Sequence, residues 1–118
     1  MIDKKELKRK YKETPPHMGI FQIKNLVNGK VFIDCALNLK GKENSFNFQL
    51  NAGLHINSEL QKDYNTFGAD KFIFEIIDTL EPKDEIDFNY REEIKVLKEM
   101  WIEKLKPFGE KGYNKKNN

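Results

Sequence analysis

The sequence predicts an α+β fold, an α/β sandwich in which a small three-stranded antiparallel sheet is flanked by helices. Two short runs of β-branched and aromatic residues flank Asn28-Gly29, and a third such run covers residues 71–77. Three segments carry apolar residues at helical spacing, with capping residues at their ends. Together these observations predict the order ββααβα, preceded by an N-terminal leader helix.

Length and composition fit one soluble domain. The chain has 118 residues, of which 38% are hydrophobic, and this is enough for one modest core. The net charge of +2 does not by itself indicate a nucleic-acid-binding protein. Because Cys35 is the only cysteine, no internal disulfide can form, and we expect a small buried side chain in a reducing compartment. No apolar run fits a signal peptide or a transmembrane helix, so we expect a cytoplasmic protein without a membrane partner.

Residues 1–14 form the first predicted unit, a basic leader helix. Its five lysines and one arginine outnumber its three acidic residues, and Leu7 and Tyr11 lie one helical turn apart. Such a segment either contacts phosphates or is an ordinary solvated helix. Two prolines end it, so we expect the folded domain over residues 17–114 and a polar tail over residues 115–118.

The three strands are predicted from short runs that suit a pleated surface. Residues 20–23 and 30–33 form a hairpin, because Asn28 and Gly29 tolerate the positive φ angles of a tight primed turn. Residues 71–77 are predicted to form the central strand, mostly buried on both faces. The acidic stretch that follows, up to residue 90, is predicted to be a loop.

Two helices are predicted between the second and third strands. Asn38 caps the first helix, which ends at Gly53. Asn57 or Ser58 caps the second helix, which ends at Gly68.

The last predicted helix covers residues 91–106. Ile94, Trp101 and Leu105 share its apolar face, and Lys98 falls inside that stripe. An inward-facing lysine is costly unless it is paired, so Lys98 needs an explanation.

Several of these segments resemble the GIY-YIG endonuclease family. Gly19-Ile20-Phe21 and Phe32-Ile33-Asp34 resemble the paired GIY and YIG tripeptides, with phenylalanine in place of both tyrosines and aspartate in place of the last glycine. Residues 57–62, residues 72–77 and Gly112-Tyr113-Asn114 resemble further segments of the family. The resemblance covers nearly the whole predicted domain and implies the family's ββααβα fold.

The resemblance also implies phosphodiester hydrolysis by a defined set of residues. In the family, two tyrosines, an arginine and a histidine activate water and hold the phosphate, and a glutamate binds one divalent metal ion such as Mg²⁺. In this sequence those positions fall, in the same order, on Phe21 and Phe32, Lys42, Phe46 and Lys98, whereas Asn114 matches the family's closing asparagine. Phenylalanine cannot exchange a proton, and a lysine in place of the glutamate would repel a metal ion.

Other candidate residues carry alternatives that the sequence leaves open. Lys98 either packs its stem on the core while its ammonium reaches solvent, or faces the groove that holds the family's catalytic residues. In the second case Lys98 and Lys42 together hold a phosphate without metal. Asp34 either caps the turn into the first helix or serves as a substitute metal ligand. His17 and His55 are expected to be surface or loop histidines. The tyrosines are expected on a core stripe or in the leader, loop and tail, and spacing makes none of them a general base: Tyr11, Tyr64, Tyr90 and Tyr113.

Three functions follow from these alternatives. The first is a nucleic-acid-binding pseudo-nuclease that needs no cofactor and contacts DNA phosphates through Lys42, Lys98, Asn114, the leader and residues 115–116. The second is a DNA endonuclease with a rearranged site, in which Asp34 or another carboxylate binds Mg²⁺ or Mn²⁺. The third is an interaction module, in which Phe21 and Phe32 line an apolar docking site for a protein partner or for the second copy of a homodimer.

Overall fold

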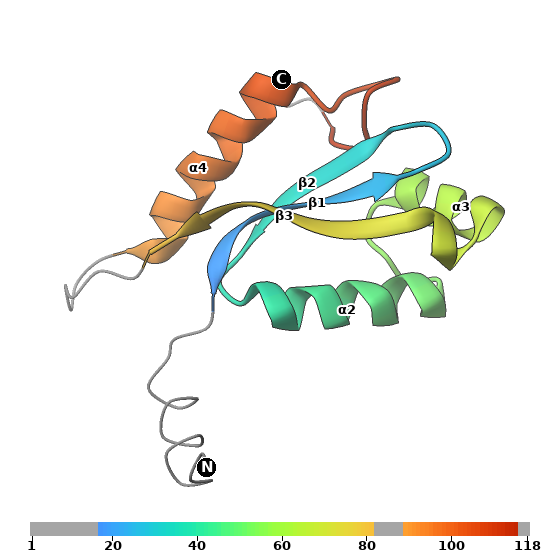
Figure 1. Cartoon of the computed structure of the whole chain (residues 1–118), viewed down its shortest axis with the longest axis horizontal. Coiled ribbons are helices and arrows are strands. Elements are labelled where there is room, and N and C mark those ends of the chain that lie inside the picture. Colours follow the sequence, from blue (N-terminus) through green and yellow to red (C-terminus); the bar gives the residue numbers. More distant parts are fainter. Residues whose placement is uncertain (1–16, 82–88, 116–118) are drawn as a thin grey trace, which may run out of the picture.

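The computed structural model describes residues 17–81 and 89–115 and has the predicted α+β architecture (Figure 1). In chain order the elements are β1 (Met18–Asn25), β2 (Val31–Ala36), α2 (Leu39–Ala52), α3 (Ser58–Phe67), a 3₁₀ turn (Ala69–Lys71), β3 (Phe72–Leu80) and α4 (Tyr90–Leu105). The order ββααβα is therefore confirmed. The predicted leader helix and most of the acidic loop lie outside the described residues. Within the described ranges, no helix combines the length and the apolar character needed to span a membrane.

β1 and β2 form the predicted antiparallel hairpin, but their connection is longer than a two-residue turn. It covers residues 26–30, and the N–H of Gly29 donates to the carbonyl of Asn25 at 2.8 Å. Only Gly29 has a positive φ there, at 78°, whereas Asn28 acts through its side chain, which accepts from the N–H of Lys30 at 2.9 Å. The predicted primed turn is therefore wrong, because it would need positive φ at both residues.

β1 is the central strand of the sheet, so the prediction that the third strand is central is wrong. The strand order is β2-β1-β3, and β3 pairs antiparallel to β1 at an edge. Ile73 and Ile76 of β3 are 37% and 54% exposed. In β1, by contrast, the neighbours Ile20 and Phe21 point to opposite faces and are both fully buried. Hydrophobic composition alone did not separate these two cases.

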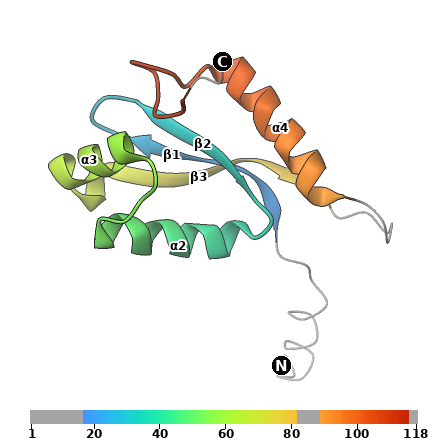
Figure 2. The ribbon, with the colours of Figure 1, turned by 180° about the vertical axis from the view of Figure 1, so that it is seen from behind.

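Helices cover both faces of the sheet and give three layers (Figures 1 and 2). α2 and α3 pack on one face, and α4 packs on the other. The first face holds the larger core cluster, which comprises Phe21, Ile23, Ala36, Leu39, Phe46, Leu50, Leu60 and Tyr113. The second face holds Met18, Ile20, Ile33 and Ile94, with Leu97, Trp101 and Ile102 of α4 packed against them. β2, at the edge of the sheet, is therefore within reach of helices on both sides.

Asparagine side chains cap α2, α3 and α4 at their N-termini. Asn38 accepts from the third residue along in α2, and Asn57 and Asn89 do the same for α3 and α4. Gly53 follows α2 in the left-handed conformation, and Gly68 follows α3. The predicted limits of α2 and α3 are therefore confirmed.

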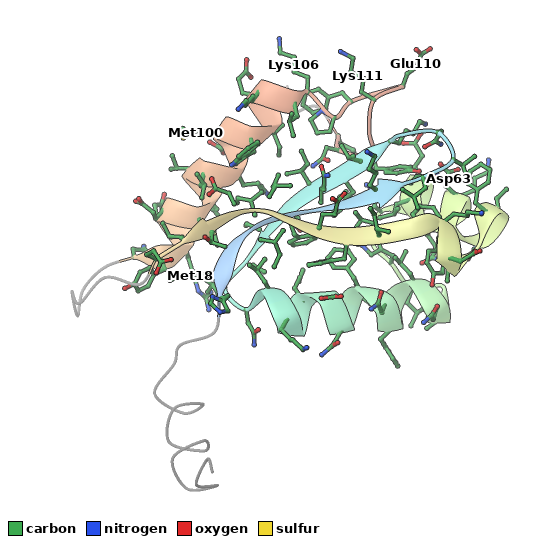
Figure 3. All side chains as sticks on the ribbon, viewed as in Figure 1. Met18, Asp63, Met100, Lys106, Glu110 and Lys111 are labelled. Atoms are coloured by element: carbon green, nitrogen blue, oxygen red, sulfur yellow. The ribbon has the colours of Figure 1, made fainter. Side chains whose placement is uncertain are left out.

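α4 has the predicted apolar face with one exception at its end. Ile94 is 3% exposed, and Trp101 donates from Nε1 to Asp78 Oδ2 of β3 at 2.8 Å. Met100 points away from the sheet and is 62% exposed (Figure 3). Leu105 is 39% exposed, because the helix ends at this residue and does not continue along the sheet.

The segment after α4 runs along the outer edge of β2. The N–H of Val31 donates to the carbonyl of Lys111, and the N–H of Tyr113 donates to the carbonyl of Val31 at 2.9 Å. Tyr113 lies in the segment after the last helix, as predicted, but it is only 1% exposed and belongs to the core. This segment covers an edge that would otherwise present unpaired backbone groups.

Two glycines permit close backbone approach at the two edges of this hairpin. A Cβ at Gly19 would lie 2.1 Å from the carbonyl oxygen of Asp78 in β3. A Cβ at Gly112 would lie 2.4 Å from the carbonyl oxygen of Pro107 and 2.5 Å from that of Val31. Any other residue at either position would force these segments apart.

Candidate functional site

The candidate site is built around Phe32 and Asp34 of β2, with side chains from both helical layers. The ring of Phe46 in α2 lies 5.9 Å from that of Phe32, centroid to centroid. Nζ of Lys42, also in α2, lies 5.3 Å from the centre of the Phe46 ring. Nζ of Lys98 in α4 lies 3.6 Å from Oδ1 of Asp34. We call this set, together with His55, the β2 site.

Phe21 belongs to the core and not to the β2 site. Its side chain is fully buried, stacks on Phe74 at 4.7 Å and meets the edge of Phe46 at 5.2 Å. The interaction-module hypothesis needs Phe21 to face a partner, and in that respect it is wrong. Phe32 is half-buried.

His55 is a residue of the β2 site that the sequence did not reveal. It lies in the loop between α2 and α3, as one of the two expected alternatives had it, but it is not at the surface. It is 7% exposed and packs against Phe46 at 4.7 Å and, edge-on, against Phe32 at 5.6 Å. Its Nδ1 accepts from the N–H of Asn57 at 3.0 Å, which puts the proton of the neutral ring on Nε2. Nε2 is buried without a hydrogen-bond partner among the described residues.

The charge on His55 is controlled by its surroundings. Burial lowers the pKa of His55 below its ordinary value, and the nearby Lys42 ammonium lowers it further, while the hydrogen bond from Asn57 and the Asp34 carboxylate oppose the shift. The imidazole is therefore neutral at neutral pH. Lys42 forms no ion pair within residues 17–81 and 89–115, so its positive charge is not neutralised by a direct partner there.

The carboxylate of Asp34 interacts with Lys98 and with the backbone of Cys35. Its carboxylate pairs with Lys98, whose side chain is 32% exposed, and it accepts from the N–H of Cys35 at 2.8 Å. The expectation that Asp34 caps the turn into α2 is wrong, because it lies within β2 and Asn38 provides the cap. Burial, and then the Asp34 charge, raise the pKa of the Cys35 thiol, so it is not an activated nucleophile.

The β2 site offers a divalent metal ion one carboxylate, that of Asp34. Within the described ranges no three His, Cys, Asp or Glu side chains are grouped to hold a metal, and Mg²⁺ held through a single carboxylate needs that group to be open to it. Nζ of Lys98 lies 3.6 Å from Oδ1 of that carboxylate, so a metal ion bound there would meet a positive charge.

Asn114 fixes the edge of β2 beside the site. Its Oδ1 accepts from the N–H of Ile33 at 2.8 Å, and its Nδ2 donates to the carbonyl of the same residue at 2.8 Å. The neighbouring carbonyl of Tyr113 accepts from Asn57 Nδ2 at 2.8 Å. Since both polar ends of the Asn114 amide are bonded to the backbone, it holds the strand in place.

Two solved structures resemble this architecture. The catalytic domain of the intron endonuclease I-TevI, in a mutant form, shares 26% identity with a TM-score of 0.68 over 83% of this chain and 92% of that chain. The catalytic domain of the homing endonuclease I-TevI shares 29% identity with a TM-score of 0.67 over 85% of this chain and 99% of that chain. I-TevI is a GIY-YIG homing endonuclease. The chain therefore has the fold of a GIY-YIG catalytic domain. No protein-family model matches the sequence, and no curated protein does.

Within this GIY-YIG fold, the positions singled out from the sequence divide into two groups. Phe32, Lys42, Phe46 and Lys98 meet at the β2 site. Phe21 lies in the core and not in the β2 site, although its ring contacts that of Phe46. The sequence missed His55 because only the tertiary fold brings the loop after α2 against β2.

Proposed function

We propose that this GIY-YIG domain binds nucleic acid through its phosphates and does not cleave it. The ion pair between Lys98 and Asp34 carries the proposal. The resemblance places the family's metal-binding glutamate at Lys98, and here an ammonium stands at that position and neutralises the adjacent carboxylate. A divalent cation would have to displace Lys98 and would then meet its positive charge.

The remaining side chains of the β2 site support the loss of chemistry. Phe32 and Phe46 stand where the resemblance puts a tyrosine and a histidine, and neither ring can accept or donate a proton. His55 retains a proton on Nε2 and is neutral, but its Nδ1 is bonded to the backbone of Asn57. Among the described residues of the β2 site, water activation therefore lacks a general base.

Phosphate binding rests on the lysines. The ammonium groups of Lys42 and Lys98 flank β2 from the two helical layers. Lys42 supplies the sequence-independent attraction that phosphates require, and Lys98 neutralises the Asp34 carboxylate that would otherwise repel them. The basic leader of residues 1–14 and the lysines of residues 115–116 add to this attraction. Asn114 contributes indirectly, because its amide is bonded to Ile33 and holds β2 between them.

The binding test compares lysines on and off the β2 site. Affinity for a fluorescent DNA duplex is measured by anisotropy over a series of salt concentrations. Lys42→Ala and Lys98→Gln should each weaken binding and reduce the slope of log K against log salt by roughly 1. Lys71→Ala removes the same charge from an exposed position beside β3, at the far edge of the sheet, and should change the slope less.

The cleavage test uses supercoiled plasmid with Mg²⁺ or Mn²⁺. We expect no nicking with either ion. Metal-dependent nicking that disappears in Asp34→Asn would favour the rearranged endonuclease. The absence of any DNA binding at low salt would overturn the binding role.

A further inference from the structure

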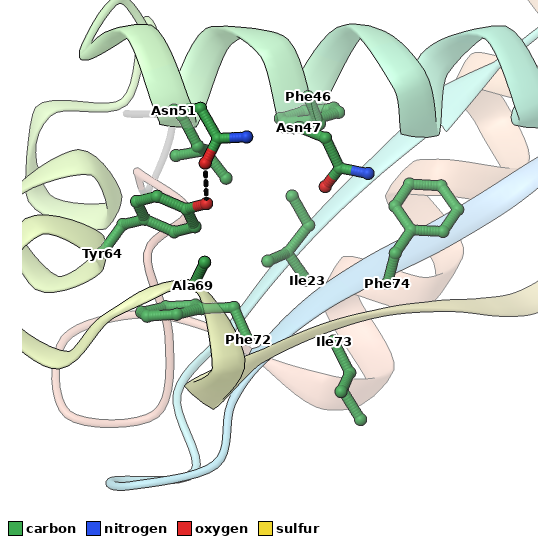
Figure 4. Close-up of a pocket in the computed structure, with 10 residues that line it drawn as sticks. Ile23, Phe46, Asn47, Asn51, Tyr64, Ala69, Phe72, Ile73 and Phe74 are labelled. Carbon is green, nitrogen blue, oxygen red and sulfur yellow. Dashed lines mark hydrogen bonds between the residues drawn. The ribbon is translucent and has the colours of Figure 1, made fainter.

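A cavity of about 250 Å³ lies between α2, α3 and the beginning of β3 (Figure 4). Of the described residues that line it, none belongs to strand β2, so the cavity adjoins the β2 site without including its Phe32 and Asp34. Phe46 is common to both, because its ring lines the cavity and also packs on Phe32. The cavity is small for a ligand site and has the size of a compact planar molecule.

The walls of the cavity are mainly aromatic and aliphatic. Tyr64 and Phe72 lie on one side with their ring centres 5.4 Å apart, and Phe74 lies on the other side of Ile23 (Figure 4). No charged side chain is found among the described residues that line it. Such walls suit the faces of an uncharged heteroaromatic ring, since nucleobases stack on aromatic side chains in this way.

The polar groups of the cavity come from Asn47 and Asn51. These two asparagines lie one turn apart on α2, and both side chains point toward the cavity (Figure 4). The hydroxyl of Tyr64 donates to Oδ1 of Asn51, which fixes that amide and leaves its N–H groups available. Asn47 forms no side-chain hydrogen bond with another described residue, so both its acceptor and its donors are available. An asparagine amide pairs bidentately with adenine, accepting from the N6 amino group and donating to N7.

We propose that this cavity binds an adenine base, with the ring against Phe72 and Phe74 and the N6/N7 edge on Asn47. The shape and the donor–acceptor pattern specify the base, which can come from a free nucleoside or from an unpaired position of a nucleic-acid strand. The proposal does not depend on phosphate binding at the β2 site.

The experiment is a titration of the ¹⁵N-labelled full chain with adenosine, followed by NMR of the asparagine side-chain amides. Adenosine should shift the Asn47 and Asn51 amide signals in a saturable way. N6,N6-dimethyladenosine has the same ring but no N6 donor, so it should bind about fivefold or more weakly. Asn47→Ala should weaken adenosine binding to the same extent, whereas Asn44→Ala, one turn earlier on α2 and outside the cavity, should leave it unchanged.

A second arm distinguishes the sources of the base. A short oligoadenylate that shifts the same amides when adenosine does not would support binding of a base presented by a strand. Failure of both probes, or equal binding of adenosine and its dimethyl derivative, would overturn the proposal. Because adenosine carries no phosphate, this result is separate from the outcome of the DNA-binding test.

Discussion

Removal of one buried hydroxyl, in Tyr113→Phe, should destabilise the domain strongly. The hydroxyl of Tyr113 accepts from Asn25 Nδ2 at 3.0 Å and donates to Asp63 Oδ2 at 2.7 Å. Tyr113 is 1% exposed and Asn25 is fully buried, so water cannot replace the lost partner at the Asn25 amide. The bonds link three segments distant in the sequence: β1, α3 and the segment after α4.

The expected magnitude follows from these contacts. Leaving the buried Asn25 donor unpaired costs about 1–3 kcal/mol, and losing a hydrogen bond to the charged Asp63 adds a comparable but not fully additive amount. We expect the free energy of unfolding to fall by about 2–4 kcal/mol. For a domain of this size, that corresponds to a decrease in Tm of roughly 10–20 °C.

Urea unfolding followed by circular dichroism measures this loss, and Tyr64→Phe is the matched control. That substitution removes the same atom, but the hydrogen bond from Tyr64 to Asn51 is exposed to solvent, so the expected loss is below about 0.5 kcal/mol. Equal losses in the two variants would refute the argument that burial makes the Tyr113 bonds important.

The same residue predicts a dependence on alkaline pH. Burial raises the pKa of Tyr113 from 10.0 to about 12. Because the folded state holds the phenolic proton more tightly than the unfolded state, this stabilisation is fully present below about pH 10 and is lost as the pH rises toward 12. Between about pH 10 and pH 12 the free energy of unfolding should therefore fall less in Tyr113→Phe than in the unmodified chain, as measured by urea unfolding.

Two further substitutions test the surroundings of the β2 site. Burial lowers the pKa of His55, so its stabilising contribution should be complete above about pH 6.5 and decline as the pH falls, and urea unfolding of His55→Leu should show less of this acid decline. Asn114→Ala loses both hydrogen bonds to Ile33 and should lower the free energy of unfolding by about 1–2 kcal/mol, whereas Asn114→Asp retains the acceptor and should lose less. A pH response that is unchanged in His55→Leu, or an Asn114→Ala variant as stable as the original, would contradict these two predictions.

Most of the fold could be predicted because its signals are local. The asparagine caps and the glycines after α2 and α3 act within one helical turn, and the strands are marked by their own β-branched and aromatic residues. The order of strands in the sheet depends on pairing between segments that are distant in the sequence, so no local signal predicts it. Residues 71–77 are more apolar than an edge strand needs. β1 is central because it pairs with both β2 and β3, and these pairings form only in the folded chain.

The candidate site was predicted less completely, for a related reason. Lys98 was recognisable as unusual because helical periodicity placed it on the apolar face of α4, but its partner Asp34 is 64 positions earlier and could not be identified by spacing. His55 and Tyr113 lie in loop-like sequence without periodicity. Their burial depends on contacts with β2 and α3 that form only in the folded chain.

The most direct test of the central claim measures cleavage and binding on one preparation of the full chain. Plasmid nicking is assayed with Mg²⁺ and with Mn²⁺, and duplex affinity is measured at low and at higher salt. The account predicts binding that weakens steeply with salt and no nicking with either ion. Nicking that requires the metal would contradict it, because it would mean that Lys98 and Asp34 do not exclude the ion from the β2 site.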